Sequence, residues 1–125
     1  MQQSALIYVK TAPGKGRGVF ARTAIRKGKL IECVPVLLVP PKDLVDGLKN
    51  PTLNTYFYQW TKKHFAVSLG YGSLYNHSFE PNVVFKYGRD NLKYVALRNI
   101  EAEEELTINY NGDPKNKLKV DFDVV

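Results

Sequence analysis

The stretch GYGSLYNHSFEPN, residues 70–82, packs several polar side chains between aromatic residues and closes with a proline and an asparagine. Its polar side chains include Asn76, His77, Ser78 and Asn82. Buried amide and imidazole groups cost free energy unless they are hydrogen-bonded. The cluster must therefore tie backbone segments together or face a polar ligand. For His77 alone we expect a structural role, because no Ser, Asp or Glu lies at a spacing that indicates a catalytic relay.

The composition is that of one globular domain. The chain has 125 residues, of which 44% are hydrophobic and 24% charged, and both values are ordinary for a folded domain. We expect a single domain over residues 1–125, with a core over about 6–112. The N-terminus lacks a charged leader followed by an apolar run, and no apolar stretch reaches the ~20 residues of a membrane span. These features predict a soluble protein that is not secreted and does not enter a membrane.

Cysteine and histidine are too few for a metal cluster. Cys33 is the single cysteine, and it is joined by His64 and His77 only. An internal disulfide is therefore excluded, and a zinc site rich in cysteine cannot form. We expect no metal.

The charge is uneven along the chain. Residues 1–63 carry 11 Lys/Arg against 3 Asp/Glu (+8), whereas residues 64–125 carry 7 against 9 (−2). A basic half can attract an acidic partner such as nucleic acid, although it is more often a solvated face. A binding module that contacts nucleic acid through Arg17, Arg22 and Arg26, with Tyr8 and Phe20 between them, is thus one alternative.

Short runs rich in β-branched and aromatic residues predict a mostly β fold. They span residues 6–9, 19–21, 30–39, 83–87, 94–97 and 106–108. Residues 86–93 read as a hairpin, because Gly88 to Asn91 tolerate positive φ. Short helices are expected near 43–48, which Asp43 can cap, and over 54–61, where aromatic residues recur at helical spacing.

A glycine-rich turn lies near the N-terminus, in GKGRGVF at residues 14–20. Alternating glycines leave backbone N–H groups uncovered, which suits a nucleotide-like ligand. The glycines lead into a strand rather than a helix, and no Gly-Lys-Ser/Thr follows, so neither a dinucleotide fingerprint nor a phosphate loop is indicated. A plain turn between two strands is the alternative.

Three motifs occur in order: Gly16-Arg17-Gly18, Asn76-His77-Ser78-Phe79-Glu80-Pro81-Asn82, and Glu104-Glu105-Leu106-Thr107-Ile108-Asn109-Tyr110. Together they resemble the SET domain of protein-lysine methyltransferases, over about residues 15–110. The chain is similar to minimal stand-alone SET proteins of bacteria, archaea and large viruses. The resemblance implies a β-clip-like fold of several small twisted sheets with few short helices. It also implies a pseudoknot, in which the C-terminal strand passes beneath the loop of the Asn-His turn.

The resemblance further implies an S-adenosylmethionine-dependent enzyme, with S-adenosylhomocysteine as its product. The implied cofactor-binding residues are Lys15, Gly16, Arg17, Gly18, Tyr75, Asn76, His77, Tyr110 and Phe122. The implied catalytic tyrosine is Tyr110. Tyr56, Tyr58 and Tyr71 are the candidates to line a lysine channel with it. For Tyr56, Tyr58 and Trp60, ordinary core packing is the alternative.

Two departures from the family pattern lead to further expectations. No cysteine cluster follows the catalytic strand, so we expect the tail 113–125 to close the site, with Phe122 on the adenine or the channel wall. Cys33 or a neighbour stands where many members place a channel tyrosine, which leaves the number of methyl groups transferred open.

The implied partner is a protein that presents a lysine, such as a histone or another basic protein. Because minimal SET proteins can pair through an exposed face, a homodimer is an alternative to a monomer. The expected location is the cytoplasm or a host nucleus. A SET-like module that has lost catalysis is the remaining alternative.

Overall fold

The computed structural model describes residues 4–14, 16–40, 57–61 and 64–110; within 57–61 it describes the side chains of Tyr58 and Trp60. Every regular element in these ranges is a β-strand, and no helix occurs among them. The strands are β1 (Ile7–Ala12), β2 (Gly16–Ala21), β3 (Leu30–Val39), β4 (Phe57–Thr61), β5 (His64–Ser68), β6 (Asn76–His77), β7 (Val83–Tyr87), β8 (Asn91–Ala96) and β9 (Glu105–Ile108). The expected mostly β fold of small sheets is confirmed.

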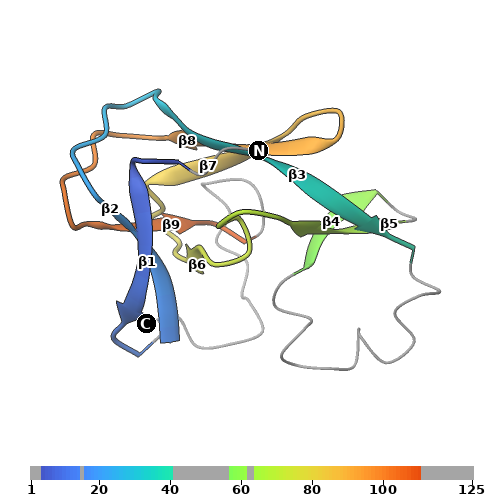
Figure 1. Cartoon of the computed structure of the whole chain (residues 1–125), viewed down its shortest axis with the longest axis horizontal. Coiled ribbons are helices and arrows are strands. Elements are labelled where there is room, and N and C mark those ends of the chain that lie inside the picture. The colour runs from blue at the N-terminus through green and yellow to red at the C-terminus, as the bar shows by residue number, and fades with distance from the viewer. Residues whose placement is uncertain (1–3, 15, 41–56, 62–63, 111–125) are drawn as a thin grey trace.

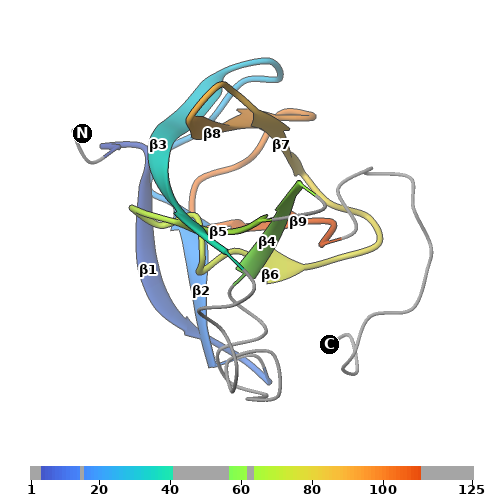
Figure 2. The same cartoon turned by 90° about the vertical axis from the view of Figure 1, so that its right-hand side faces the viewer.

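The strands form two sheets (Figures 1 and 2). One has four strands in the order β1-β2-β9-β6, and the other has five in the order β4-β5-β3-β8-β7. The long strand β3 pairs with β8 through its first half and with β5 through Val36 to Val39. It therefore joins two small sheets into one, and its bend allows both to curl around a shared core.

The core is made of apolar side chains from both sheets. Val19 and Leu106 come from the first sheet, and Val34, Val83 and Leu92 come from the second. All five are almost completely buried. Their burial is the main favourable free-energy term available to a domain of this size.

Most strand predictions hold, but the helix expected over 54–61 is wrong where it can be compared, since residues 57–61 form β4. Tyr58 and Trp60 lie two positions apart and pack edge-on against Phe85 and Tyr87, at ring distances of 5.0 and 5.1 Å. This spacing of two on both strands is that of a sheet, and the aromatic contacts outweigh a marginal helical pattern. Residues 43–48 and 54–56 lie outside the described ranges, as does the tail 113–125. Strands β5 and β6 were not predicted.

The hairpin predicted over 86–93 is present, because β7 pairs with β8 up to Tyr87 and Leu92. Its turn differs from the expected type, since none of residues 88–91 has a positive φ. The Gly88 N–H donates to the Asn91 carbonyl at 2.8 Å. A side chain at Gly88 would overlap the Asn91 amide, so the glycine is required for space rather than for φ.

Strand β9 is enclosed by the loop that follows β6. Successive residues of a strand direct their backbone groups to opposite edges. Strand β2 pairs with β9 at Glu105 and Leu106, and β6 pairs with it at Thr107 and Ile108. The Ala21 N–H and the Ser78 N–H donate to the carbonyls of Glu104 and Ile108, which are four positions apart, so β2 and β6 follow one another along the same edge of β9. The Asn82 side chain binds the other edge, at Glu105 and Thr107. Residues 78–82 must therefore cross over β9, as the pseudoknot requires.

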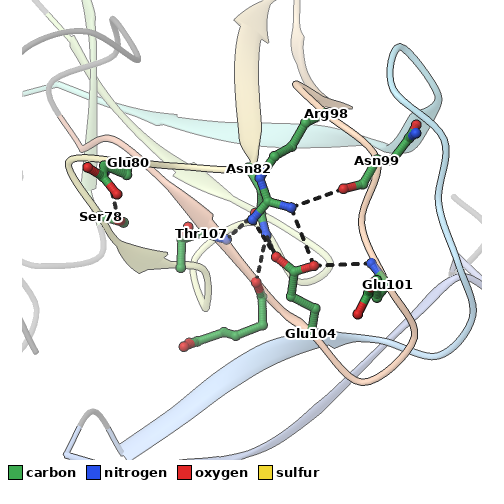
Figure 3. Close-up of polar contacts among 9 residues, drawn as sticks. Ser78, Glu80, Asn82, Arg98, Asn99, Glu101, Glu104 and Thr107 are labelled. Carbon is green, nitrogen blue, oxygen red and sulfur yellow. Dashed lines mark hydrogen bonds and ion pairs between the residues drawn. The ribbon is translucent and has the colours of Figure 1, made fainter.

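The Asn82 amide takes the place of a neighbouring strand on that second edge. Its Nδ2 donates to the Glu105 carbonyl at 2.8 Å, and its Oδ1 accepts the Thr107 N–H at 2.8 Å. Figure 3 shows Glu104 and Arg98 beside this amide. Glu104 Oε2 accepts from Asn82 Nδ2 at 3.2 Å and is paired with Arg98. These contacts help to orient the Asn82 amide.

We expect Asn82→Asp to lower the free energy of unfolding by about 2–3 kcal/mol at pH 7, as measured by urea denaturation. The aspartate still accepts the Thr107 N–H, but it cannot donate to the Glu105 carbonyl and it faces the Glu104 carboxylate. Asn99→Asp is the matched control, because Asn99 Oδ1 only accepts, from the Lys27 N–H. We expect that change to stay within about 0.5 kcal/mol. Equal effects of the two variants would contradict the bridging role.

Candidate functional site

The glycine-rich strand β2 and the Asn-His strand β6 pair with adjacent halves of β9 and are joined by a side chain. Asn76 Nδ2 donates to the Arg17 carbonyl at 3.1 Å and to Glu105 Oε2 at 2.7 Å. One amide therefore joins three strands that are far apart in sequence. The glycine motif and the Asn-His motif therefore meet in space.

The two glycines of this junction have different reasons to be glycine. At Gly18, an added Cβ would lie 2.6 Å from Glu105 Oε2 and 2.9 Å from Asn76 Nδ2, so the protein itself fills that space. Gly16 has φ +73°, and an added Cβ would meet nothing within 4 Å. Gly16 is also exposed. The backbone that a ligand can approach is thus at Gly16, whereas Gly18 serves internal packing.

His77 fixes the end of β9. Its side chain is almost fully buried, and its Nδ1 accepts the backbone N–H of Tyr110 at 2.9 Å. Because Nδ1 is an acceptor, the neutral ring carries its proton on Nε2. The ring also meets the Tyr110 ring edge-on at 5.2 Å. These contacts support the structural role expected for His77, which is to hold Tyr110 in place.

Tyr110 stands at the boundary between the core and solvent. Its side chain is held at the hydroxyl, which donates to the Tyr75 carbonyl at 2.7 Å, and 37% of the residue remains exposed. A tyrosine hydroxyl that donates its proton to a carbonyl can also accept a hydrogen bond through its oxygen. Tyr110 can therefore accept a hydrogen bond from a group that approaches from solvent.

Tyr75 reaches the site through its backbone and not through its ring. The ring is buried, is stacked on Tyr94 at 4.6 Å, and donates its hydroxyl to Glu32 Oε1 at 2.7 Å. Burial raises the pKa of Glu32, and hydrogen bonds from the Tyr75 hydroxyl and the Tyr71 N–H partly offset this rise. Sequence reasoning did not find Glu32, although a lone carboxylate in the apolar strand LIECV was a usable signal.

A cluster of buried hydroxyls lies beside this pair. The Tyr58 hydroxyl donates to the Gly72 carbonyl at 2.7 Å and accepts from the Tyr94 hydroxyl at 3.1 Å, while Ser68 Oγ lies 2.9 Å from the latter. Burial raises the pKa of Tyr58 and of Tyr94. Both therefore stay protonated at neutral pH and act as hydrogen-bonding groups, not as bases. Nothing in the sequence pattern pointed to Ser68 or Tyr94.

Two of the remaining predicted site residues are described by the structure, and three are not. Tyr71 is half-buried and Arg17 is exposed. Tyr71 contributes its backbone N–H to Glu32, as Arg17 contributes its carbonyl to Asn76. Lys15, Tyr56 and Phe122 lie outside the described residues.

The aromatic residues suggested for nucleic acid are occupied within the protein. Phe20 is buried, and Lys10 Nζ lies 4.3 Å from its ring centroid. The Arg22 guanidinium lies 5.0 Å from the Tyr8 centroid, and the Tyr8 hydroxyl donates to Glu103. Each of these two rings thus has a cation of the chain beside it.

Within the described ranges, no group of three or more His, Cys, Asp or Glu side chains could hold a metal ion. No helix in the same ranges is long and apolar enough to cross a membrane.

Comparison with known proteins identifies the family to which this fold and this site belong. Residues 16–111 match the model of the SET domain family. The chain is 37% identical over 109 residues to a histone-lysine N-methyltransferase, H3 lysine-37 specific, of Schizosaccharomyces pombe, covering 86% of this chain and 74% of the relative. It is 28% identical to the N-lysine methyltransferase KMT5A-A of Danio rerio, covering 90% of this chain and 37% of that protein.

A solved structure gives the same result. The crystal structure of a Plasmodium falciparum protein assigned as a histone methyltransferase superposes with a TM-score of 0.72 at 29% sequence identity. The match covers 88% of this chain and 95% of that one. The chain belongs to the SET-domain family of protein-lysine methyltransferases. It is an enzyme that methylates lysine in a protein substrate.

We expect Glu32→Gln to become more stable relative to the unmodified protein as the pH rises from about 4 towards 8. The pKa of Glu32 is raised in the folded state, so the unfolded state loses its proton first. The stability that this group contributes is then complete below the unfolded pKa and is lost as the pH rises through the folded pKa, at about 1.4 kcal/mol per pKa unit. Glutamine does not titrate.

The measurement is urea denaturation of both proteins at several pH values. Titrations elsewhere in the chain cancel in the difference between them. A difference that stays constant, or that moves in favour of Glu32 as the pH rises, would contradict the assignment of a raised pKa.

Proposed function

We propose that the chain transfers the methyl group of S-adenosylmethionine to the side-chain amine of a lysine, and that the slot between β2, β6 and Tyr110 is where this happens. The observation that carries the proposal is the Asn76 to Arg17 hydrogen bond of 3.1 Å. This bond holds the strand that contains Gly16 beside the strand that contains His77. His77 in turn accepts the N–H of Tyr110, whose side chain is partly exposed.

The residues of this junction fit a sulfonium nucleoside. Gly16 offers exposed backbone with open space where a side chain would stand, and Arg17 beside it is exposed. Asn76 and His77 would hold the ligand mainly through their backbone, since their side chains are engaged with Arg17, Glu105 and Tyr110. The bound donor supplies a methyl group on a positively charged sulfur.

Methyl transfer in this slot depends on alignment. The neutral lysine nitrogen forms a bond to the methyl carbon while the carbon–sulfur bond breaks and its electron pair stays on sulfur. An apolar channel and an adjacent positive charge both lower the pKa of the lysine from ~10.4, so no strong base is required. The Tyr110 oxygen, whose own proton points to the Tyr75 carbonyl, can accept from the amine and make weak C–H···O contacts with the methyl group.

A basic protein is the proposed substrate. The Schizosaccharomyces pombe relative is described as specific for histone H3 lysine 37, and the Plasmodium falciparum neighbour is assigned as a histone methyltransferase. We extend only the class of substrate to this chain: a lysine in a histone or another basic protein. A histone substrate would place the protein in a nucleus.

We expect S-adenosylhomocysteine, at a concentration ~100-fold above its dissociation constant, to stabilise the protein by about 2.7 kcal/mol. This is measured as a shift of the thermal unfolding midpoint. Gly16→Val should abolish the shift, because a β-branched side chain is strained at φ +73° and would occupy the open space at the junction. Gly28→Ala is the control: Gly28 also has a positive φ and open surroundings, but it lies in the turn before β3. A full shift in Gly16→Val would place the donor elsewhere.

We expect Tyr110→Phe to lower the rate of methyl transfer to lysine by about 100-fold, because the phenylalanine has no oxygen to orient the amine. The rate is measured with methyl-labelled donor and mixed histones. Tyr87→Phe is the matched control, since Tyr87 lies on β7 and packs against Trp60, outside the proposed slot. Equal rates for the unmodified protein and Tyr110→Phe would remove Tyr110 from catalysis.

A further inference from the structure

Glu32 is a buried carboxylate that is linked to Tyr110 through Tyr75. Glu32 is on β3, where the register with β8 shifts between Leu30 and Glu32. This irregularity turns Ile31 and Glu32, which are consecutive, both into the interior. Strands normally bury alternate residues. Glu32 lies two positions before the buried Val34 and so faces the interior by the regular alternation of the strand, and the bulge brings Ile31 inward beside it.

Burying a carboxylate is costly unless hydrogen bonds compensate for the lost water. Both of its recorded donors come from one short turn. The Tyr75 hydroxyl lies 2.7 Å from Glu32 Oε1, and the Tyr71 backbone N–H is the second donor. The Leu74 N–H closes the same turn on the Tyr71 carbonyl at 2.9 Å. The carboxylate thus holds both ends of the turn over residues 71–75.

Tyr75 transmits this restraint to the site. Its ring is fixed by Glu32 at the hydroxyl and by Tyr94 on its face, with an interplanar angle of 23°. Its backbone carbonyl, at the opposite end of the residue, accepts the Tyr110 hydroxyl at 2.7 Å. Because both contacts restrain the ring, they also restrain the carbonyl of the same residue.

We propose that Glu32 and Tyr75 form a positioning pair, in which the buried carboxylate anchors the Tyr75 ring so that its carbonyl aims the Tyr110 hydroxyl at the transferring methyl group. The inference rests on the proposed role of Tyr110. It adds that the position of the Tyr110 hydroxyl is controlled by two residues that contact neither the methyl donor nor the lysine. An error of about 1 Å at a reacting group can cost about 100-fold in rate, so the restraint has a measurable effect.

The kinetic test compares variants of the pair. We expect Tyr75→Phe and Glu32→Ala to lower kcat by about 10-fold or more, while the dissociation constant for S-adenosylhomocysteine and the KM for histone change by less than about twofold. Glu32→Gln should retain kcat within about threefold. The amide oxygen of the glutamine can still accept a hydrogen bond from this turn, and its NH₂ group can donate to the Tyr75 hydroxyl.

Tyr8→Phe is the matched control. It removes another tyrosine hydroxyl that donates to a glutamate, Glu103. Tyr8 itself lies on the β1–β2 hairpin, away from Tyr110. We expect its kcat to stay unchanged. Because Tyr75→Phe and Glu32→Ala can also reduce stability, kcat is measured well below each unfolding midpoint and is expressed per folded protein.

A second readout does not depend on activity. With 3-fluorotyrosine at position 110 and S-adenosylhomocysteine bound, the fluorine NMR signal should be a single narrow line in the unmodified background and in Glu32→Gln. It should broaden or split in Tyr75→Phe. If the unmodified protein proves inactive on histones, the proposed function fails while this spectrum still tests the pair.

Three results would overturn the proposal: an unchanged kcat in folded Tyr75→Phe, an equal loss of kcat in Tyr8→Phe, or a fall of kcat and product affinity together in proportion to stability. A single narrow fluorine line in Tyr75→Phe would also overturn it.

Discussion

The structure depends on a single side-chain amide that substitutes for a β-strand. Along one edge, strand β9 pairs first with β2 and then with β6, and its other edge would leave a carbonyl and an N–H without partners in the interior. Asn82 binds both groups, with a donor and an acceptor spaced as in a peptide group. An unsatisfied buried backbone group costs about 1–3 kcal/mol, so the interlaced arrangement requires an amide at this position. Asp or Ser supplies only part of the pattern.

The site follows from this enclosure. Once the loop over residues 78–82 crosses β9, its two ends are fixed on opposite edges of the strand, and β6 must run parallel to β9 at Asn76 and His77. Asn76 then reaches the Arg17 carbonyl, and His77 receives the Tyr110 N–H. Segments that start far apart in the sequence thus meet at one hydrogen-bonded junction. Such preorganisation suits a displacement reaction that gains most from alignment.

Sequence reasoning found the parts of the fold that are set by local pattern. The strand over 30–39 and the strand over 83–87 were predicted with their observed bounds, since alternation and β-branched residues act within a few positions. It failed at residues 57–61, where the deciding contacts are with Phe85 and Tyr87 on a distant strand. It also missed β6, which has only two residues and exists because β9 is beside it.

The same division applies to the site. The motifs predict Tyr110, Asn76 and Gly16 as site residues, whereas Glu32 could not be assigned a role, because its partners Tyr71 and Tyr75 lie about forty positions away. The most direct test of the enclosed slot is a crystal structure with S-adenosylhomocysteine bound. We expect the ligand against Gly16 and Asn76, with its sulfur facing a Tyr110 hydroxyl that still donates to the Tyr75 carbonyl. A ligand bound away from β2 and β6, or a Tyr110 hydroxyl turned away from the sulfur, would contradict it.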